Sequence, residues 1–182
     1  MKSLLLALSL LVSTSAFADS LACADRAYAG PFTRTEAVEL CRDAYDTAPA
    51  ECALKAYAGP FTKTEALSMC QRASTSGPVD CALKAYAGPF TKVEAVSLCD
   101  RARTDGPAVC ALKAYAGPFT KVEATRLCAR AYDAGPAECA LKAYAGPYTK
   151  DQAIDLCLRS RDGARRGGDG RRDADGRGFS AL

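Results

Sequence analysis

Apolar residues recur along the chain with the spacing of one face of a short helix. Ala95, Leu98, Cys99 and Ala102 stand at positions i, i+3, i+4 and i+7. This spacing indicates an amphipathic helix that packs its apolar stripe against a neighbour. Gly106-Pro107 follows, and we expect the helix to continue as far as this pair, where the next unit begins.

A capping box marks the start of this helix. Thr91 is followed three positions later by Glu94, a pairing in which each side chain accepts a hydrogen bond from the other's backbone amide. Gly88-Pro89 ends a preceding helix that we predict over about 78–87, with Pro78 in its first turn. The two helices form a hairpin whose apolar stripe faces inward. The same box recurs as Thr33/Glu36, Thr62/Glu65, Thr120/Glu123 and Thr149/Gln152.

The cysteines indicate that this hairpin occurs five times. A longer and a shorter gap alternate between them without a slip, with a period of 29, at Cys23, Cys41, Cys52, Cys70, Cys81, Cys99, Cys110, Cys128, Cys139 and Cys157. A fixed period of this length is typical of stacked repeats. We therefore predict an all-α fold, a short solenoid of five tandem disulfide-stapled helical hairpins. They cover residues 19–161, as about 21–48, 49–77, 78–106, 107–135 and 136–161.

Two regular disulfide pairings fit this spacing. Each bond spans either the longer gap, as from Cys52 to Cys70, or the shorter gap, as from Cys41 to Cys52. The second pairing leaves Cys23 and Cys157 without partners at the two ends of the array. We therefore predict disulfides within repeats, each worth about 3 kcal/mol to a hairpin with a small, alanine-rich core.

Repeat one differs from the others at a position inside its first helix. It carries Asp25 where the later repeats carry Leu54, Leu83, Leu112 and Leu141. The difference predicts that each leucine packs on the preceding repeat. Asp25, with no repeat before it, would then be the polar cap that a solenoid requires.

The two ends of the chain do not follow the repeat. Residues 1–18 combine Lys2, a short apolar run and Ala16-Phe17-Ala18, which predicts a signal peptide cleaved after Ala18. That run is too short to span a bilayer, and we expect no transmembrane segment elsewhere. Residues 162–182 are rich in Gly, Arg and Asp and predict a disordered tail. We expect a periplasmic or secreted protein, where disulfides persist.

The composition removes the commonest kinds of catalytic site. The chain has no histidine and no tryptophan, and its formal net charge is +3. Without histidine there is no imidazole base and no Ser-His or Cys-His pair. We expect no enzyme activity and no cofactor, although a carboxylate- or lysine-based site stays open. Cysteine thiolates that bind copper or zinc are a further alternative, against which the absence of C-x-x-C spacing argues.

Basic and aromatic residues recur once per repeat, so stacking would align them in rows. The candidate ligand-binding residues are Lys55, Lys84, Lys113 and Lys142 with Tyr57, Tyr86, Tyr115 and Tyr144. A second basic row is Lys63, Lys92, Lys121 and Lys150. Such rows could hold an acidic protein face or an anionic envelope polymer; an exported protein is not expected to meet nucleic acid. Alternatively, they are solvated positions copied by duplication, with tyrosines packed between repeats.

Differences between repeats concentrate on the second helix and the loop after it. They include Glu39, Ser68, Ser97, Arg126 and Asp155, then Arg42-Asp43, Gln71-Arg72 and Asp100-Arg101. A binding surface tailored repeat by repeat would vary in this way, and so would unconstrained solvent-exposed positions. We expect a non-catalytic binding or envelope scaffold module and predict no particular ligand or oligomeric state.

Overall fold

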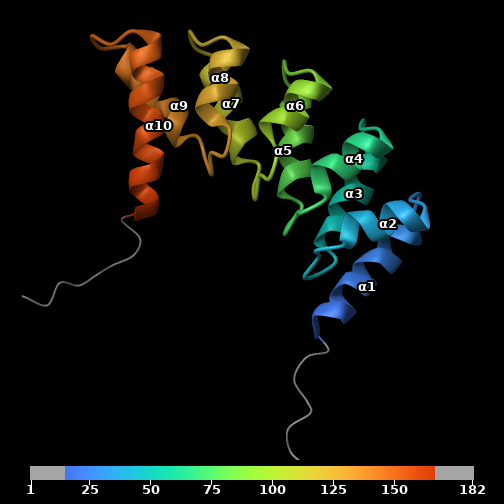
Figure 1. The fold of residues 1–182 in the computed structure, drawn as a ribbon. Coiled ribbons are helices and arrows are strands. Elements are labelled where there is room, and N and C mark those ends of the chain that lie inside the picture. The colour runs from blue at the N-terminus through green and yellow to red at the C-terminus, as the bar shows by residue number, and fades with distance from the viewer. Residues whose placement is uncertain (1–14, 167–182) are drawn as a thin grey trace, which may run out of the picture.

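The computed structural model describes the backbone of residues 15–166 and the side chains of residues 19–158. Within that backbone range the chain forms ten α-helices and no strand. The helices are α1 (Ser15–Tyr28), α2 (Arg34–Cys41), α3 (Ala48–Ala58), α4 (Lys63–Cys70), α5 (Gly77–Tyr86), α6 (Lys92–Leu98), α7 (Gly106–Tyr115), α8 (Lys121–Cys128), α9 (Gly135–Tyr144) and α10 (Lys150–Arg166). They pair into five hairpins that stack as an arch (Figure 1), which confirms the predicted fold class.

One disulfide closes each hairpin, so the pairing predicted within repeats is confirmed. The bonds are Cys23–Cys41, Cys52–Cys70, Cys81–Cys99, Cys110–Cys128 and Cys139–Cys157. The joined Cα atoms lie 5.5–5.8 Å apart, within the usual range for a disulfide. This follows from the antiparallel hairpin, which places the two cysteines at the same height. Buried alanines surround the sulfurs, and the disulfides supply stability that such small side chains cannot.

The predicted capping boxes start the second helix of each hairpin. In repeat three, the backbone amide of Thr91 donates to Glu94 over 2.8 Å, and the amide of Glu94 donates to the Thr91 hydroxyl over 3.3 Å. In repeat five, Gln152 replaces the glutamate and accepts from the Thr149 amide over 2.9 Å. The capping box therefore supplies acceptors for two of the backbone amides that have no partner within the helix at each helix start.

The second helices of repeats one to four are shorter than the sequence pattern predicts. We expected the helix of repeat three to reach Gly106-Pro107, but α6 ends at Leu98. Arg101 has a backbone φ of 56°, in the left-handed region where an α-helix cannot continue, and Arg130 has the same role after α8 with a φ of 75°. Ala102 is buried as expected, although it lies in the loop after α6, where its backbone amide donates to the carbonyl of Cys99 over 3.0 Å.

Successive repeats pack mainly through their first helices, with a leucine of one repeat against a glycine of the repeat before it. A Cβ atom placed on Gly30 would lie 2.4 Å from Cδ2 of Leu54. The same contact recurs for Gly88 with Leu112, which confirms that these leucines pack on the preceding repeat. Asp25 occupies the equivalent position in α1 and is exposed.

Side chains of different size explain the curvature of the arch. On its outer edge, where the turns within hairpins lie (Figure 1), Phe90 packs against Tyr115 of the next repeat with ring centroids 6.3 Å apart. On its inner edge, backbones almost touch: a Cβ on Gly77 would lie 2.3 Å from the carbonyl carbon of Arg103. Repeats that are separated by aromatic rings outside and by glycine inside must bend toward the inner edge.

The first and last helices reach beyond residues 19–161, the predicted limits of the repeat array. Helix α1 begins at Ser15, inside the segment assigned to the signal peptide, and α10 continues to Arg166, through the first residues of the predicted tail. Helix α10 thus covers residues 162–166, where we expected the tail to begin. Residues 1–14 and 167–182 lie outside the described residues. Within the range that is described, no helix is both long and apolar enough to cross a membrane.

Candidate binding surface

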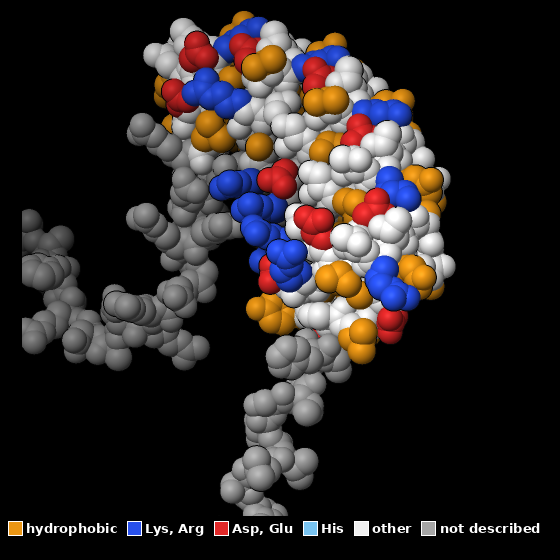
Figure 2. All heavy atoms as spheres, turned by 45° about the vertical axis from the view of Figure 1, so that its right-hand side comes forward, with side chains coloured by type: hydrophobic (Ala, Val, Ile, Leu, Met, Phe, Trp, Pro, Cys, Tyr) orange, Lys and Arg blue, Asp and Glu red, His pale blue; other side chains and the backbone are white. Residues whose placement is uncertain are grey.

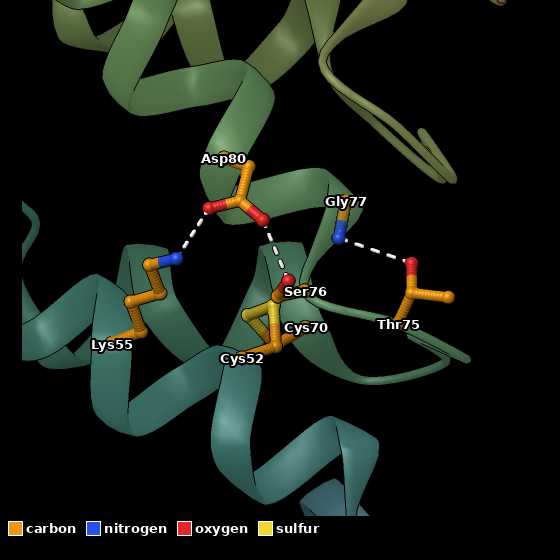
Figure 3. Close-up of a disulfide and its surroundings, with 7 residues drawn as sticks. All are labelled: Cys52, Lys55, Cys70, Thr75, Ser76, Gly77 and Asp80. Carbon is orange, nitrogen blue, oxygen red and sulfur yellow. Dashed lines mark hydrogen bonds and ion pairs between the residues drawn. A yellow bond between two sulfur atoms is a disulfide. The ribbon is translucent and has the colours of Figure 1, made fainter.

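The lysines of the first predicted row reach across to the next repeat. Lys55 lies 2.5 Å from the carboxylate of Asp80, beside the Cys52–Cys70 disulfide (Figure 3). Lys84 reaches Asp105 in the same way over 2.6 Å, and Lys113 pairs with Glu138. Lys142 belongs to the last hairpin, which no further hairpin follows in the part of the chain that the structure describes.

Asp80 shows how these pairs are fixed. Partial burial opposes its ionisation, but hydrogen bonds from Lys55 and Ser76 and the lysine charge hold the pKa of Asp80 below its ordinary value. The Ser76 hydroxyl donates over 2.6 Å at the start of α5. The lysine charge is therefore largely compensated in place, and ligand binding by this row stays a prediction.

The second lysine row contacts the capping boxes of the preceding repeat. Lys63 lies 3.8 Å from Glu36, and Lys121 lies 3.7 Å from Glu94. The pKa values of these two glutamates lie below 4.5, chiefly because each carboxylate accepts from the backbone amide of its capping threonine, and then because of the threonine side chain and the neighbouring lysine. The sequence alone does not show this link, because the partners stand almost one full period apart, in different repeats.

The four candidate tyrosines pack between repeats. Each ring stands tilted against a phenylalanine of the preceding repeat with centroids 6.1–6.3 Å apart, in the pairs Phe32–Tyr57, Phe61–Tyr86, Phe90–Tyr115 and Phe119–Tyr144. The tyrosines remain 38–43% exposed. Their packing accounts for one tyrosine per repeat, and their use in ligand binding stays a prediction.

A different set of cations lies on the inner edge of the arch. Three adjoining hollows of about 450, 340 and 560 Å³ follow the loops between repeats. Arg103 lines all three of them. We name this continuous surface the arginine groove, after Arg72, Arg101, Arg103 and Arg130.

The loops that carry these arginines are held by contacts between repeats. The Thr75 hydroxyl donates to the backbone carbonyl of Arg103 over 3.1 Å, and Thr104 donates to that of Tyr132 over 3.3 Å. The close approach of Gly77, two residues after Thr75, constrains the same backbone. The backbone of the groove therefore belongs to the rigid stack, and its arginine side chains project from positions set by the fold.

The arginine groove differs from the lysine rows in its ion pairs. Arg101 lies 3.8 Å from its own neighbour Asp100, an exposed pair of little energetic weight. For Arg72, Arg103 and Arg130, no ion pair is found with any side chain in residues 19–158. Figure 2 shows a continuous run of Lys and Arg side chains along the hollowed edge, with some Asp and Glu side chains beside it, whereas other cations on the visible face stand singly.

The end of the groove toward repeat one is acidic. Glu39, Asp43 and Asp46 line the hollow there, together with Tyr45, whose side chain is 86% exposed. At the other end Tyr132 lines the hollow and is 52% exposed. The groove therefore changes sign along its length, from carboxylates beside repeat one to guanidinium groups over repeats two to four.

Most of the varying positions that the sequence analysis named lie in the arginine groove, whereas the repeated lysines and tyrosines contact neighbouring repeats. Ser68, Gln71-Arg72 and Asp100-Arg101 line the groove, as does Glu39. Sequence reasoning missed Arg103, Arg130 and Asp46, because their loop geometry follows from the early end of the second helices. Arg126 and Asp155 instead pair with each other over 2.7 Å.

Metal binding by thiolates requires reduced cysteines, and all ten cysteines are disulfide-bonded in this structure. Residues 19–158 also contain no other cluster of metal-ligating side chains. No family model, no curated protein and no solved structure matches the chain.

Proposed function

We propose that this protein is an exported, non-catalytic binding scaffold, whose disulfide-closed array presents the arginine groove to a partner. One observation carries the proposal: Arg72, Arg103 and Arg130 converge on one groove without acidic partners among the described side chains. The repeated lysines, in contrast, pair with neighbouring repeats. Charges that stabilise the fold are compensated locally, and charges left uncompensated on a rigid surface are available to a partner.

The titratable groups support binding rather than catalysis. A general acid or base works best with a pKa near the working pH. Among the described residues, the carboxylates with a resolved pKa shift are Glu36, Glu65, Asp80, Glu94 and Glu123, and each shift is downward. All five are capping or ion-pair partners, so each has a structural task and stays ionised.

The disulfides support export. Bonds of this kind form and persist in the periplasm or outside the cell, and they are rare in a reducing cytosol. Export would remove residues 1–18 and leave Asp19 as the first residue, within α1. Repeat one would keep its disulfide and its contacts with α2.

Mass spectrometry of the protein from the producing cell tests the export half of the proposal. We expect an intact mass equal to residues 19–182, found outside the cytoplasm, that rises by about 10 Da on reduction of five disulfides. Free thiols or a cytoplasmic protein that retains residues 1–18 would overturn this half.

Adsorption to envelopes of the producing cell tests the scaffold half. We expect the wild-type protein to bind and R72Q/R103Q/R130Q to lose binding. The matched control, K55Q/K84Q/K113Q, removes the same charge from the lysine row and should still bind. Equal loss in both variants, or no adsorption by the wild type, would contradict binding through the groove.

A further inference from the structure

Resting on the proposed function, we infer that the arginine groove binds an extended acidic peptide segment of a partner protein. Acidic side chains of this segment pair with Arg72, Arg101, Arg103 and Arg130, and a basic residue at one end of it meets Asp43 and Asp46. The groove thereby selects the direction of the peptide as well as its charge.

The spacing of the arginines suits an extended chain. They come from three successive loops, between α4 and α5, α6 and α7, and α8 and α9. Packed helices stand about 8–10 Å apart, which three residues of extended backbone span at about 3.3 Å each. An acidic side chain at every third position therefore meets one loop after another. A guanidinium group matches a carboxylate with two parallel hydrogen bonds, which favours arginine over lysine in this role.

The backbone of two of these arginines supports a role for their side chains. Arg101 and Arg130 are the non-glycine residues with positive φ in the described backbone. Glycine adopts this conformation without the steric cost that other residues carry. Strained backbone conformations concentrate at functional sites, and here both instances carry a guanidinium group into the same groove.

The acidic end of the groove distinguishes a peptide from a uniform polyanion. A polyphosphate or an anionic polysaccharide that followed the groove would be repelled by Glu39, Asp43 and Asp46. A peptide can change sign along its length and so match both ends. The exposed rings of Tyr45 and Tyr132 flank the charged stretch, and tyrosine with arginine is the composition that protein interfaces favour.

A labelled synthetic peptide tests the inference by fluorescence anisotropy with the full oxidised chain. The probe has about 12 residues, with a lysine pair at one end and aspartate at every third position thereafter. We expect binding that R72Q/R103Q/R130Q weakens by about tenfold or more, as the loss of charge-assisted hydrogen bonds requires. The K55Q/K84Q/K113Q control should bind within about twofold of the wild type. Circular dichroism and reduction mass shifts confirm that each variant folds with its disulfides.

A double variant, D43N/D46N, and a second probe, inorganic polyphosphate, test the sign change. D43N/D46N should weaken the binding of the lysine-ended peptide and strengthen the binding of inorganic polyphosphate of equal charge. If polyphosphate binds the wild type more tightly than the peptide, or if the lysine-row control loses as much as the groove variant, the inference is overturned. Groove-dependent adsorption to envelopes without peptide binding would leave the proposed function standing and remove this inference alone.

Discussion

Leu112 packs so closely on Gly88 that a Cβ atom on the glycine would lie 2.5 Å from the leucine Cδ2. No glycine in the described backbone has a positive φ, so the glycine is required for space and not for its backbone conformation. The same leucine–glycine contact joins the first helices of successive repeats along the array. At this contact, each interface between repeats therefore depends on the absence of a glycine side chain.

Replacing this glycine should destabilise the stack. Gly88→Ala forces Leu112 or its helix to shift, and we expect a loss of about 1–3 kcal/mol in the free energy of unfolding, measured with urea at fixed redox state. The chain offers a matched control in Gly146, where a Cβ would meet only carbonyl oxygens of its own helix at 3.3 Å or more. Gly146→Ala should stay within about 0.5 kcal/mol of the wild type. An equal effect at both positions would show that the leucine contact is not the cause.

Removing one disulfide should cost a repeat much of its stability. C81A/C99A opens an 18-residue separation, for which the chain-entropy model gives about 3 kcal/mol. Chemical unfolding of the oxidised protein measures the loss, and peptide mapping verifies that the other four bonds are intact. An unchanged unfolding midpoint would mean that the stacked neighbours, rather than the covalent bond, hold the hairpin together.

The capping boxes should make stability depend on pH in acid. The pKa values of Glu36, Glu65, Glu94 and Glu123 are lower in the folded protein than the ordinary 4.5, chiefly because the backbone amides of the capping threonines donate to the carboxylates. Their stabilisation is therefore present above pH 4.5 and is lost as the pH falls through the folded values. Urea titrations at a series of pH values from above 4.5 downward should show this decrease in the free energy of unfolding.

Repeat five supplies the control for that titration. Gln152 keeps the hydrogen bond from the Thr149 amide without a titratable group. In a variant with glutamine at all four glutamate positions, the free energy of unfolding should fall less steeply with decreasing pH than in the wild type. The variant should retain its helices. Identical acid slopes would assign the pH dependence to other carboxylates.

Asp25 should prevent the first repeat from packing on the last repeat of another molecule. Asp25→Leu places a leucine on an exposed position of α1 that no preceding repeat covers in the described residues, while Gly146 in repeat five is not covered by a leucine in the described structure. We expect D25L to associate head to tail, with a weight-average mass in sedimentation that rises with concentration. Asp25→Asn removes the charge and adds no apolar surface, so it is the reference. Equal masses for D25L and D25N would argue against the capping role.

Replacing Arg101, which has a left-handed backbone conformation, should raise the stability of the protein and weaken its binding of the peptide. Arg101→Gly removes the steric cost of a φ of 56° and should raise the free energy of unfolding by about 1 kcal/mol. It should also weaken the acidic peptide probe. Arg72→Gly is the contrast, since Arg72 does not have a positive φ, and it should lose stability as well as binding. A rise in the free energy of unfolding for both variants would indicate that loop flexibility, not strain at Arg101, determines the stability change.

The sequence predicts the repeated features of this fold and fails where the repeat varies. Cysteine spacing and capping boxes specify five hairpins and their disulfides, because both signals depend on local and periodic residues. The early end of α6 was not predicted, since arginine at residue 101 gives no sign of a positive φ. The partner of Lys55 was missed because Asp80 stands far along the chain, in the next repeat. The groove arises from loops that do not share one sequence, so no period indicates it.

Because every disulfide lies within one hairpin, the array has a limited mechanical reach. A pulling force applied at the two ends passes through each pair of bonded cysteines and bypasses the residues between them. An unfolded but oxidised repeat can then extend by about 45 Å, against about 100 Å for a reduced repeat of roughly 29 residues at roughly 3.5 Å each. The covalent bonds thus limit the chain to less than half the length that the reduced chain could reach, even where its helices have been pulled apart.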